Sequence, residues 1–274
     1  WSSFNDEYSI LNAPFTRTLY PFSINIFDEE IVTMHRHGGI IGLPLAPRVL
    51  GGYIDKRQNW NYVVDRRGHY VGPYGRYKRW NHNRWMLRHF LEPDDTIAKI
   101  PKPMIPWHRI GHDALRAVLD TTMKDLNIDQ DAAMELIEAD YVSAEPFLQN
   151  LFHMIDLIMD DAGSKRCPLD TFNLSHPWRH ICIGSDLDGL IDPIDICPTA
   201  SEYPYFHDRL KQFIPIFLIM RRMEAKPHPS PEDRGIRDYD HYFNDAFTID
   251  DALGYLFYES LKEFTRWNCG PPRP

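Results

Sequence analysis

The sequence predicts an α/β fold, in which short buried strands alternate with helices. Two apolar runs of strand length, 39–45 and 180–186, lack the polar alternation of a half-exposed strand. Such runs are typical of strands that are covered on both faces, as in parallel sheets. Each run follows a segment with helical features, so the order helix then strand occurs twice. Two strands do not make a stable sheet, which predicts further strands that pair with them.

The first helix is expected to begin at Asp28 and to end at the glycine pair 38–39. The acids Asp28, Glu29 and Glu30 suit the positive end of a helix dipole. Glycine is common where a helix ends. The first strand then follows directly at 39–45.

Residues 53–130 are predicted to form a long insertion between the strands, irregular at first and helical later. The apolar stretches 62–64 and 69–71 are separated by a short turn sequence, which favours a hairpin. Helical periodicity begins at about Asp113, where the apolar residues share one face. These residues are Leu115, Val118, Leu119, Met123 and Leu126.

A second helix is expected from about Glu145 to Gly163 and leads through a polar loop to the run at 180–186. Pro146 is acceptable in the first turn of a helix, and Gly163 closes it. The apolar face of this helix is formed by Phe147, Leu148, Leu151, Phe152, Ile155 and Ile158.

The C-terminal region, 201–267, is predicted to be helical. Its first helix covers about 203–223 and is kinked or interrupted at Pro215. The last helices start at Thr248, a suitable N-cap with Asp251 three residues later. Their buried face is predicted to contain Leu253, Leu256, Phe257, Leu261 and Phe264.

Composition and charge limit the function classes. The chain has 274 residues, of which 43% are hydrophobic and 25% charged, as in ordinary globular proteins. No apolar run approaches the roughly 18–20 residues that a membrane helix requires. The net charge of −9 disfavours non-specific nucleic-acid binding by the chain as a whole. Four cysteines without a CxxC pair indicate no zinc knuckle, and Cys182 is expected to be a small buried residue.

Two histidine pairs have spacings that bear on metal binding. His108 and His112 are four residues apart, which on a helix would place both on one face. Pro106 and Gly111 favour a loop or a helix start there instead. His35 and His37 are two residues apart, which is wrong for one helix face, and we expect them at the surface.

A carboxylate at the end of the second strand carries the clearest chemical signal. In the string Gly184-Ser-Asp186-Leu-Asp188-Gly189, a buried strand delivers Asp186 at its C-terminal end. Ligands and catalytic groups gather at that end of α/β sheets. Asp186 could act there as a general base or a metal ligand. Alternatively, Asp186 and Asp188 cap the following turn, as aspartate often does.

The string from His180 to Gly189 resembles the last barrel strand of the membrane (renal) dipeptidase family, zinc peptidases of the amidohydrolase superfamily. The preceding helix, 151–163, is similar to the helix before that strand. The segment 25–43 is similar to the penultimate helix and strand of the family. The three segments occur in the order of the family and cover about half of the chain.

The resemblance implies a (β/α)8 TIM-type barrel in which 39–45 and 180–186 are the last two strands. Residues 1–274 would then form a single incomplete barrel domain, its C-terminal portion. The family holds two zinc ions, and nothing in this chain matches its metal-binding strands. The ligands are therefore expected upstream of residue 1, with none in this chain, and the chain alone is expected to be inactive.

The resemblance also implies a function, the hydrolysis of a dipeptide or similar small amide by a metal-activated water. Asp186 would take up and hand on a proton, while Gly184, Asp188 and Gly189 shape the turn. The family binds the substrate carboxylate with an arginine at the position of Ile24. Arg17 could replace it from nearby, so amide hydrolysis is a safer expectation than dipeptidase specificity.

Two other functions stay open. The first is a barrel relative without catalysis that binds a partner through the insertion. Between Lys56 and Arg88, nine basic residues and one acid are interleaved with aromatics, which suits base stacking and phosphate contact. A lid over the catalytic face is the favoured interpretation of this segment. The second is a haloacid dehalogenase-type phosphatase, with Asp186 as nucleophile and Asp188 as general acid.

Overall fold

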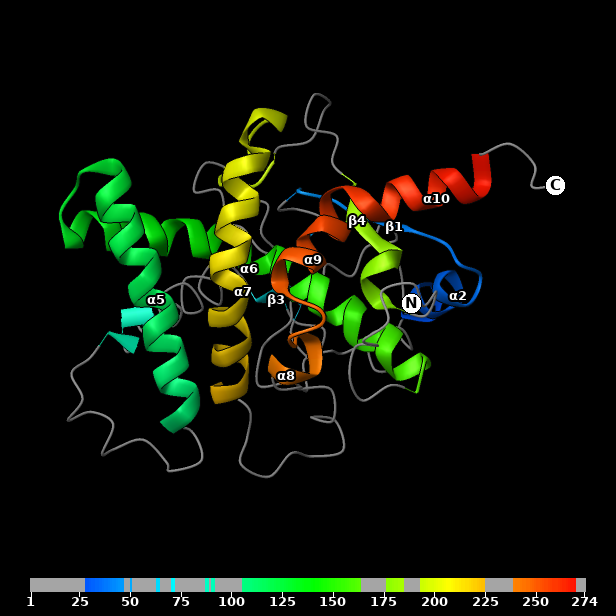
Figure 1. The fold of residues 1–274 in the computed structure, drawn as a ribbon, viewed down its shortest axis with the longest axis horizontal. Helices are drawn as coiled ribbons and strands as arrows, with labels where there is room; N and C mark the ends of the chain where they lie inside the picture. The colour runs from blue at the N-terminus through cyan, green and yellow to red at the C-terminus, as the bar shows by residue number, and fades with distance from the viewer. Residues whose placement is uncertain are drawn as a thin grey trace.

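The computed structural model of the protein describes residues 28–46, 50, 63–64, 70–71, 87–88, 90–91, 105–163, 176–184, 193–224 and 239–269. This part is mostly helical and contains a two-stranded parallel sheet and a two-stranded antiparallel one (Figure 1). The predicted α/β class is therefore confirmed. None of the described helices has the length and hydropathy needed to cross a bilayer.

The first helix and strand lie where the sequence predicts them. Helix α2 covers Asp28–Arg36 and strand β1 covers Ile41–Leu43. Gly38 has a φ of +67°, a left-handed conformation that favours glycine. The amide of Gly39 donates to the carbonyl of Met34 at 2.8 Å, which satisfies one of the last helical carbonyls.

Helix α6 covers Gln130–Asp161, so the prediction of a start near Glu145 is wrong. Asp129 caps the helix by accepting a hydrogen bond from the amide of Ala132 at 2.8 Å. The helix therefore passes through Pro146 rather than starting there. Residues buried before the proline continue the apolar face toward the N-terminus: Ala133, Met134, Ile137, Tyr141 and Ala144.

Strand β4, Ile181–Ile183, follows the 3-10 helix η4, Pro177–His180, and pairs with β1 in parallel. The register places Ile41 opposite Ile181 and Leu43 opposite Ile183. These two strands are the parts of 39–45 and 180–186 that form the ladder. Cys182 is 9% exposed, which confirms the expected burial of this thiol.

Two histidine–aspartate pairs show that α2 and α6 run in the same direction. His153 Nε2 lies 2.8 Å from Asp28 Oδ1 at the start of α2. His35 Nδ1 lies 2.8 Å from Asp161 Oδ2 at the end of both helices. Because β1 and β4 are parallel as well, the two helix–strand units lie side by side in the same orientation. This arrangement is the repeating pattern of parallel α/β folds.

The insertion contains more helix than the sequence predicts. The hairpin is confirmed, with β2, Val63–Val64, antiparallel to β3, Tyr70–Val71. Helix α5 begins at Ile105 and ends at Leu126. Of the two placements expected for His108 and His112, the loop is therefore wrong, and His108 lies in the first turn of the helix. Proline is tolerated at the start of a helix. Gly111 is tolerated because the Phe90 ring fills its side, 2.5 Å from where a Cβ would lie.

Helix α7, Tyr203–Glu224, follows the short 3-10 helix η5, Ala200–Glu202, and packs beside α5 (Figure 1). It continues through Pro215 without interruption, contrary to one of the two expectations. The residues around the proline are all buried, so packing on both sides of it maintains the helix: Phe213, Ile214, Ile216, Phe217 and Leu218.

The C-terminal elements are α8, Tyr239–Tyr242, α9, Ile249–Gly254, a π-helical turn η7, Tyr255–Glu259, and α10, Ser260–Cys269. Thr248 and Asp251 form the predicted capping box at the start of α9. Leu256 is buried as predicted, whereas Leu261 is 54% exposed. The wider π turn before α10 changes the helical phase, which rotates Leu261 away from the core.

Candidate functional site

The C-terminal ends of β1 and β4 are held unusually close together by two glycines. The amide of Gly184 donates to the carbonyl of Leu43 at 3.0 Å, which continues the ladder beyond β4. A Cβ on Gly184 would lie 2.6 Å from the Cα of Gly42 and 2.8 Å from its carbonyl carbon. These are backbone atoms that cannot move aside. Gly184 therefore has a packing role in addition to the turn-shaping role predicted from the sequence.

The described residues on both sides of 185–192, the stretch that contains Asp186, are hydrogen-bonded to this edge of the parallel pair. Residues 185–192, with Asp186, Asp188 and Gly189, lie outside the described residues, as do Arg17 and Ile24. Gly184, which precedes this stretch, is bonded to Leu43. After it, the amide of Ile194 donates to the carbonyl of Leu45 at 2.8 Å.

Side chains in the middle of α6 form hydrogen bonds with the backbone at this edge. Ser143 Oγ accepts a hydrogen bond from the amide of Ile196 at 3.1 Å. Asn150 Nδ2 donates to the carbonyl of Leu50 at 3.0 Å. The segments that follow β1 and β4 are thus both hydrogen-bonded to one stretch of α6.

Glu145 is a buried carboxylate on this stretch of α6 that the sequence reasoning did not single out. It is 6% exposed and accepts a hydrogen bond from the side chain of Gln149. The available signal was an acid within an otherwise apolar helical stretch, next to Ala144 and Phe147. A buried acid at such a position has to be hydrogen-bonded or paired.

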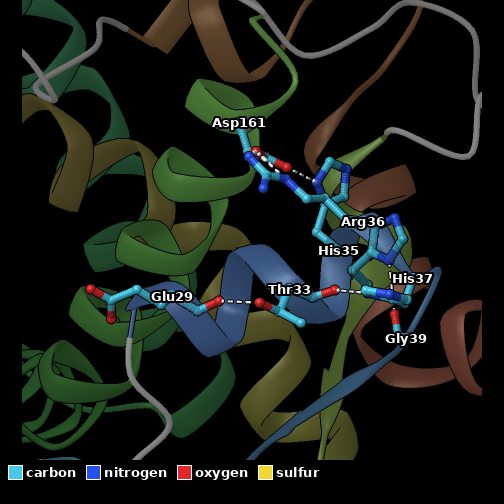
Figure 2. A network of polar contacts seen from close by, with 8 residues as sticks. Glu29, Thr33, His35, Arg36, His37, Gly39 and Asp161 are labelled. Carbon is cyan, nitrogen blue, oxygen red and sulfur yellow. Dashed lines mark hydrogen bonds and ion pairs between the residues drawn. The ribbon is translucent and has the colours of Figure 1, made fainter.

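The opposite edge of the parallel pair carries a polar cluster, which Figure 2 shows. Arg36 donates to Asp161 Oδ1 through Nε at 2.9 Å and Nη2 at 2.6 Å. These hydrogen bonds hold the pKa of the Asp161 carboxyl below its usual value, and His35 contributes less. His180 Nδ1 donates to the carbonyl of Gly39 at 2.8 Å, with its ring centroid 4.9 Å from that of His35.

His35 is therefore not the surface residue that the sequence suggests, because its side chain is only 9% exposed. His37 is exposed as expected and bonds to the carbonyl of Thr33 at 2.8 Å. The cluster precedes both strands, whereas ligands of α/β folds gather beyond the carboxyl ends. We therefore interpret it as a structural connection between α2, α6 and η4.

No group of three or more His, Cys, Asp or Glu side chains comes together as a metal site within the described ranges. His108 is buried against the ring of Phe90, whereas the side chain of His112 is 41% exposed beside Asp113. The two histidines do not form a site together, although α5 carries both.

Two thiols are free and buried, Cys182 and Cys197. Burial raises the pKa of Cys182, and burial together with Glu202 raises the pKa of Cys197 to about 11. Because the thiolate is the reactive form of cysteine, neither residue is suited to act as a nucleophile at neutral pH.

Comparison with known proteins gives no match: no family model fits the sequence, and no curated protein or solved structure is similar to it.

Proposed function

We propose that the protein is a metal-dependent hydrolase of the dipeptidase-like amidohydrolase group, acting on a dipeptide or a similar small amide. The observation that carries the proposal is the parallel pairing of β1 with β4. Both strands direct the chain to the same edge, and Asp186 follows the last residue of that ladder, Gly184, by two positions.

The role of Asp186 in this proposal is proton transfer. A carboxylate beside the scissile amide can accept a proton from the attacking water and pass it to the leaving amine. Zinc would supply the activated water. Its ligands would come from polypeptide that precedes Trp1, because no segment of this sequence resembles the metal-binding strands of the family.

The fold that we propose for this function is a (β/α)8 barrel, in which β1 and β4 are the last two strands. The equal orientation of the two helix–strand units supports it. The basic, aromatic segment 56–88 would then lie at the catalytic edge as a lid, because loops that follow barrel strands gather there.

The test uses the chain extended by the polypeptide that its reading frame encodes upstream of Trp1, loaded with zinc. We expect hydrolysis of dipeptides, with kcat reduced on the order of 10²- to 10⁴-fold by Asp186→Asn, as for removal of a general base. Asp188→Asn serves as the matched control and should retain most of the activity.

Two results would favour the alternatives. Hydrolysis of phosphate monoesters that requires both Asp186 and Asp188 would indicate the phosphatase. A protein without metal that binds polyanions, and loses that binding when 56–88 is deleted, would indicate the non-catalytic relative. An unchanged kcat in the Asp186→Asn protein would contradict the proposal.

A further inference from the structure

The ring of His176 is enclosed between the C-terminal helices and the segment that leads into β4. Its exposed fraction is 0%, and among the described residues neither Nδ1 nor Nε2 has a hydrogen-bond partner. The ring centroid lies 4.3 Å from that of Phe247 and 6.0 Å from that of Tyr255, with which it is stacked. Buried polar groups without partners are rare and costly in native proteins.

The charges around this ring oppose its protonation. Burial, with smaller contributions from the charges of Arg179 and His180, lowers the pKa of His176 to about 4. The titratable groups that face the ring or its partner Tyr255 come from η4, α9, η7 and α10. They are Arg179, His180, Asp251, Tyr255, Glu259 and Glu263.

No carboxylate among these groups is bonded to His176. Glu263 is engaged by Arg179, whose Nη2 lies 2.6 Å and whose Nε lies 2.8 Å from Glu263 Oε2. Tyr255 stays a neutral phenol, because burial and the nearby acids raise its pKa. An imidazolium ring at this position would therefore carry two N–H donors to which none of these described carboxylates is bonded.

The segment after His176 is fastened to the C-terminal helices at several points. Ser260 Oγ donates to the carbonyl of Trp178 at 2.7 Å. The Arg179–Glu263 pair joins η4 to α10, and η7 packs directly on β4. His176 lies at the start of this contact, immediately before Pro177.

We propose that His176 is an acid-sensitive latch, whose protonation releases α9, η7 and α10 from η4 and β4. The closed state encloses a neutral ring between two aromatic side chains. A protonated ring needs water or another hydrogen-bond acceptor for its N–H groups. Separation of α9, η7 and α10 from η4 and β4 would let water reach the ring.

The direction of the pH effect follows from proton linkage. The released ring regains its ordinary pKa of about 6.5, so it binds a proton at a higher pH than the enclosed ring does. The opening equilibrium is constant above that pH and rises tenfold per unit below it. This rise ends near the pKa of the enclosed ring, about 4. The open fraction should therefore increase roughly 80-fold between pH 6.5 and 4, and roughly 300-fold over the whole titration.

Hydrogen exchange of the intact protein between pH 7.5 and 4.5 tests the proposal. The protection factors of 249–269 should decrease as the pH is lowered, while those of α5 and α7 should stay constant. In the His176→Phe protein, which keeps an aromatic ring but does not titrate, protection of 249–269 should not depend on pH. The control is His112→Phe, an exposed residue of α5, which should behave as the wild type.

Three results would overturn the latch. Protection could fall equally in all helices, or the His176→Phe and wild-type profiles could coincide. Acid could also tighten 249–269, as a cation–π contact with Phe247 would predict. Should His176→Phe not fold, the ring signal of His176 in the wild-type NMR spectrum decides the question. A ring that titrates near 6.5 while 249–269 stays protected contradicts the proposal.

Discussion

Gly184 is the residue whose side chain, a single hydrogen, matters most for the candidate site. Only glycine fits between β4 and the backbone of Gly42, because a Cβ would lie 2.6 Å from the Gly42 Cα. The same contact fixes the last described residue before Asp186. The packing of two glycines thus connects the sheet to the proposed chemistry.

We predict that Gly184→Ala destabilises the protein by about 3 kcal/mol, the upper part of the range for overpacking, because backbone atoms would have to move. The matched control is Gly254→Ala in α9, where nothing lies within 4 Å of the new Cβ. That change should stabilise the helix by about 0.5–1 kcal/mol. Chemical denaturation measures both, and equal effects of the two substitutions would disprove the close approach.

At the scale of elements, α6 is the helix to which most others are joined. Its buried Asp156 accepts hydrogen bonds from Arg221 Nη2 at 2.7 Å and from the Tyr242 hydroxyl at 2.6 Å. These contacts join α6 to α7 and α8. Phe152 lies one turn before Asp156 on the same face of α6, and its ring packs against those of Trp178 and Phe217.

Removal of the Asp156 charge should therefore be costly. We expect Asp156→Asn to lower the free energy of unfolding by about 3–5 kcal/mol, because it leaves the buried Arg221 guanidinium without its counter-charge. Asp250→Asn breaks the exposed pair with Lys211, 2.7 Å apart, and should cost less than about 1 kcal/mol. A urea titration in which both variants unfold alike would contradict this view of α6.

The elements that the sequence predicts well are those with strong local signals. Asp28 and Gly38 bound α2, and Thr248 with Asp251 begins α9, because caps act within a few residues. The start of α6 is predicted wrongly at Glu145, because Pro146 alone does not show whether it lies in the first turn of a helix or inside a helix that packing stabilises. The exposure of Leu261 depends on a π turn, which apolar spacing does not reveal.

The site was predictable in part. The apolar runs predict two parallel strands, and the structure pairs them at Ile41 and Ile181. The polar cluster around Asp161 was not predictable, because its members are distant in sequence and meet only when α2 packs on α6. The place of Asp186 stays a prediction, since it lies outside the described residues.

For the whole molecule, two helix–strand units in equal orientation are the feature from which the proposed barrel and its chemistry follow. The parallel pair β1–β4 has the Asp161 cluster at one edge and Gly184, the last described residue before Asp186, at the other. Catalytic groups of parallel α/β folds lie beyond the carboxyl ends of the strands, which is the edge at Gly184. In the proposed function, zinc ions would complete the site, with ligands from polypeptide upstream of Trp1.

The zinc content of the chain extended upstream of Trp1, measured together with dipeptide hydrolysis after gel filtration, tests this account most directly. We predict close to two zinc ions per chain, as the family resemblance implies, and activity that is lost on chelation and restored by zinc. A folded, stable protein that holds no metal and hydrolyses no dipeptide would contradict it.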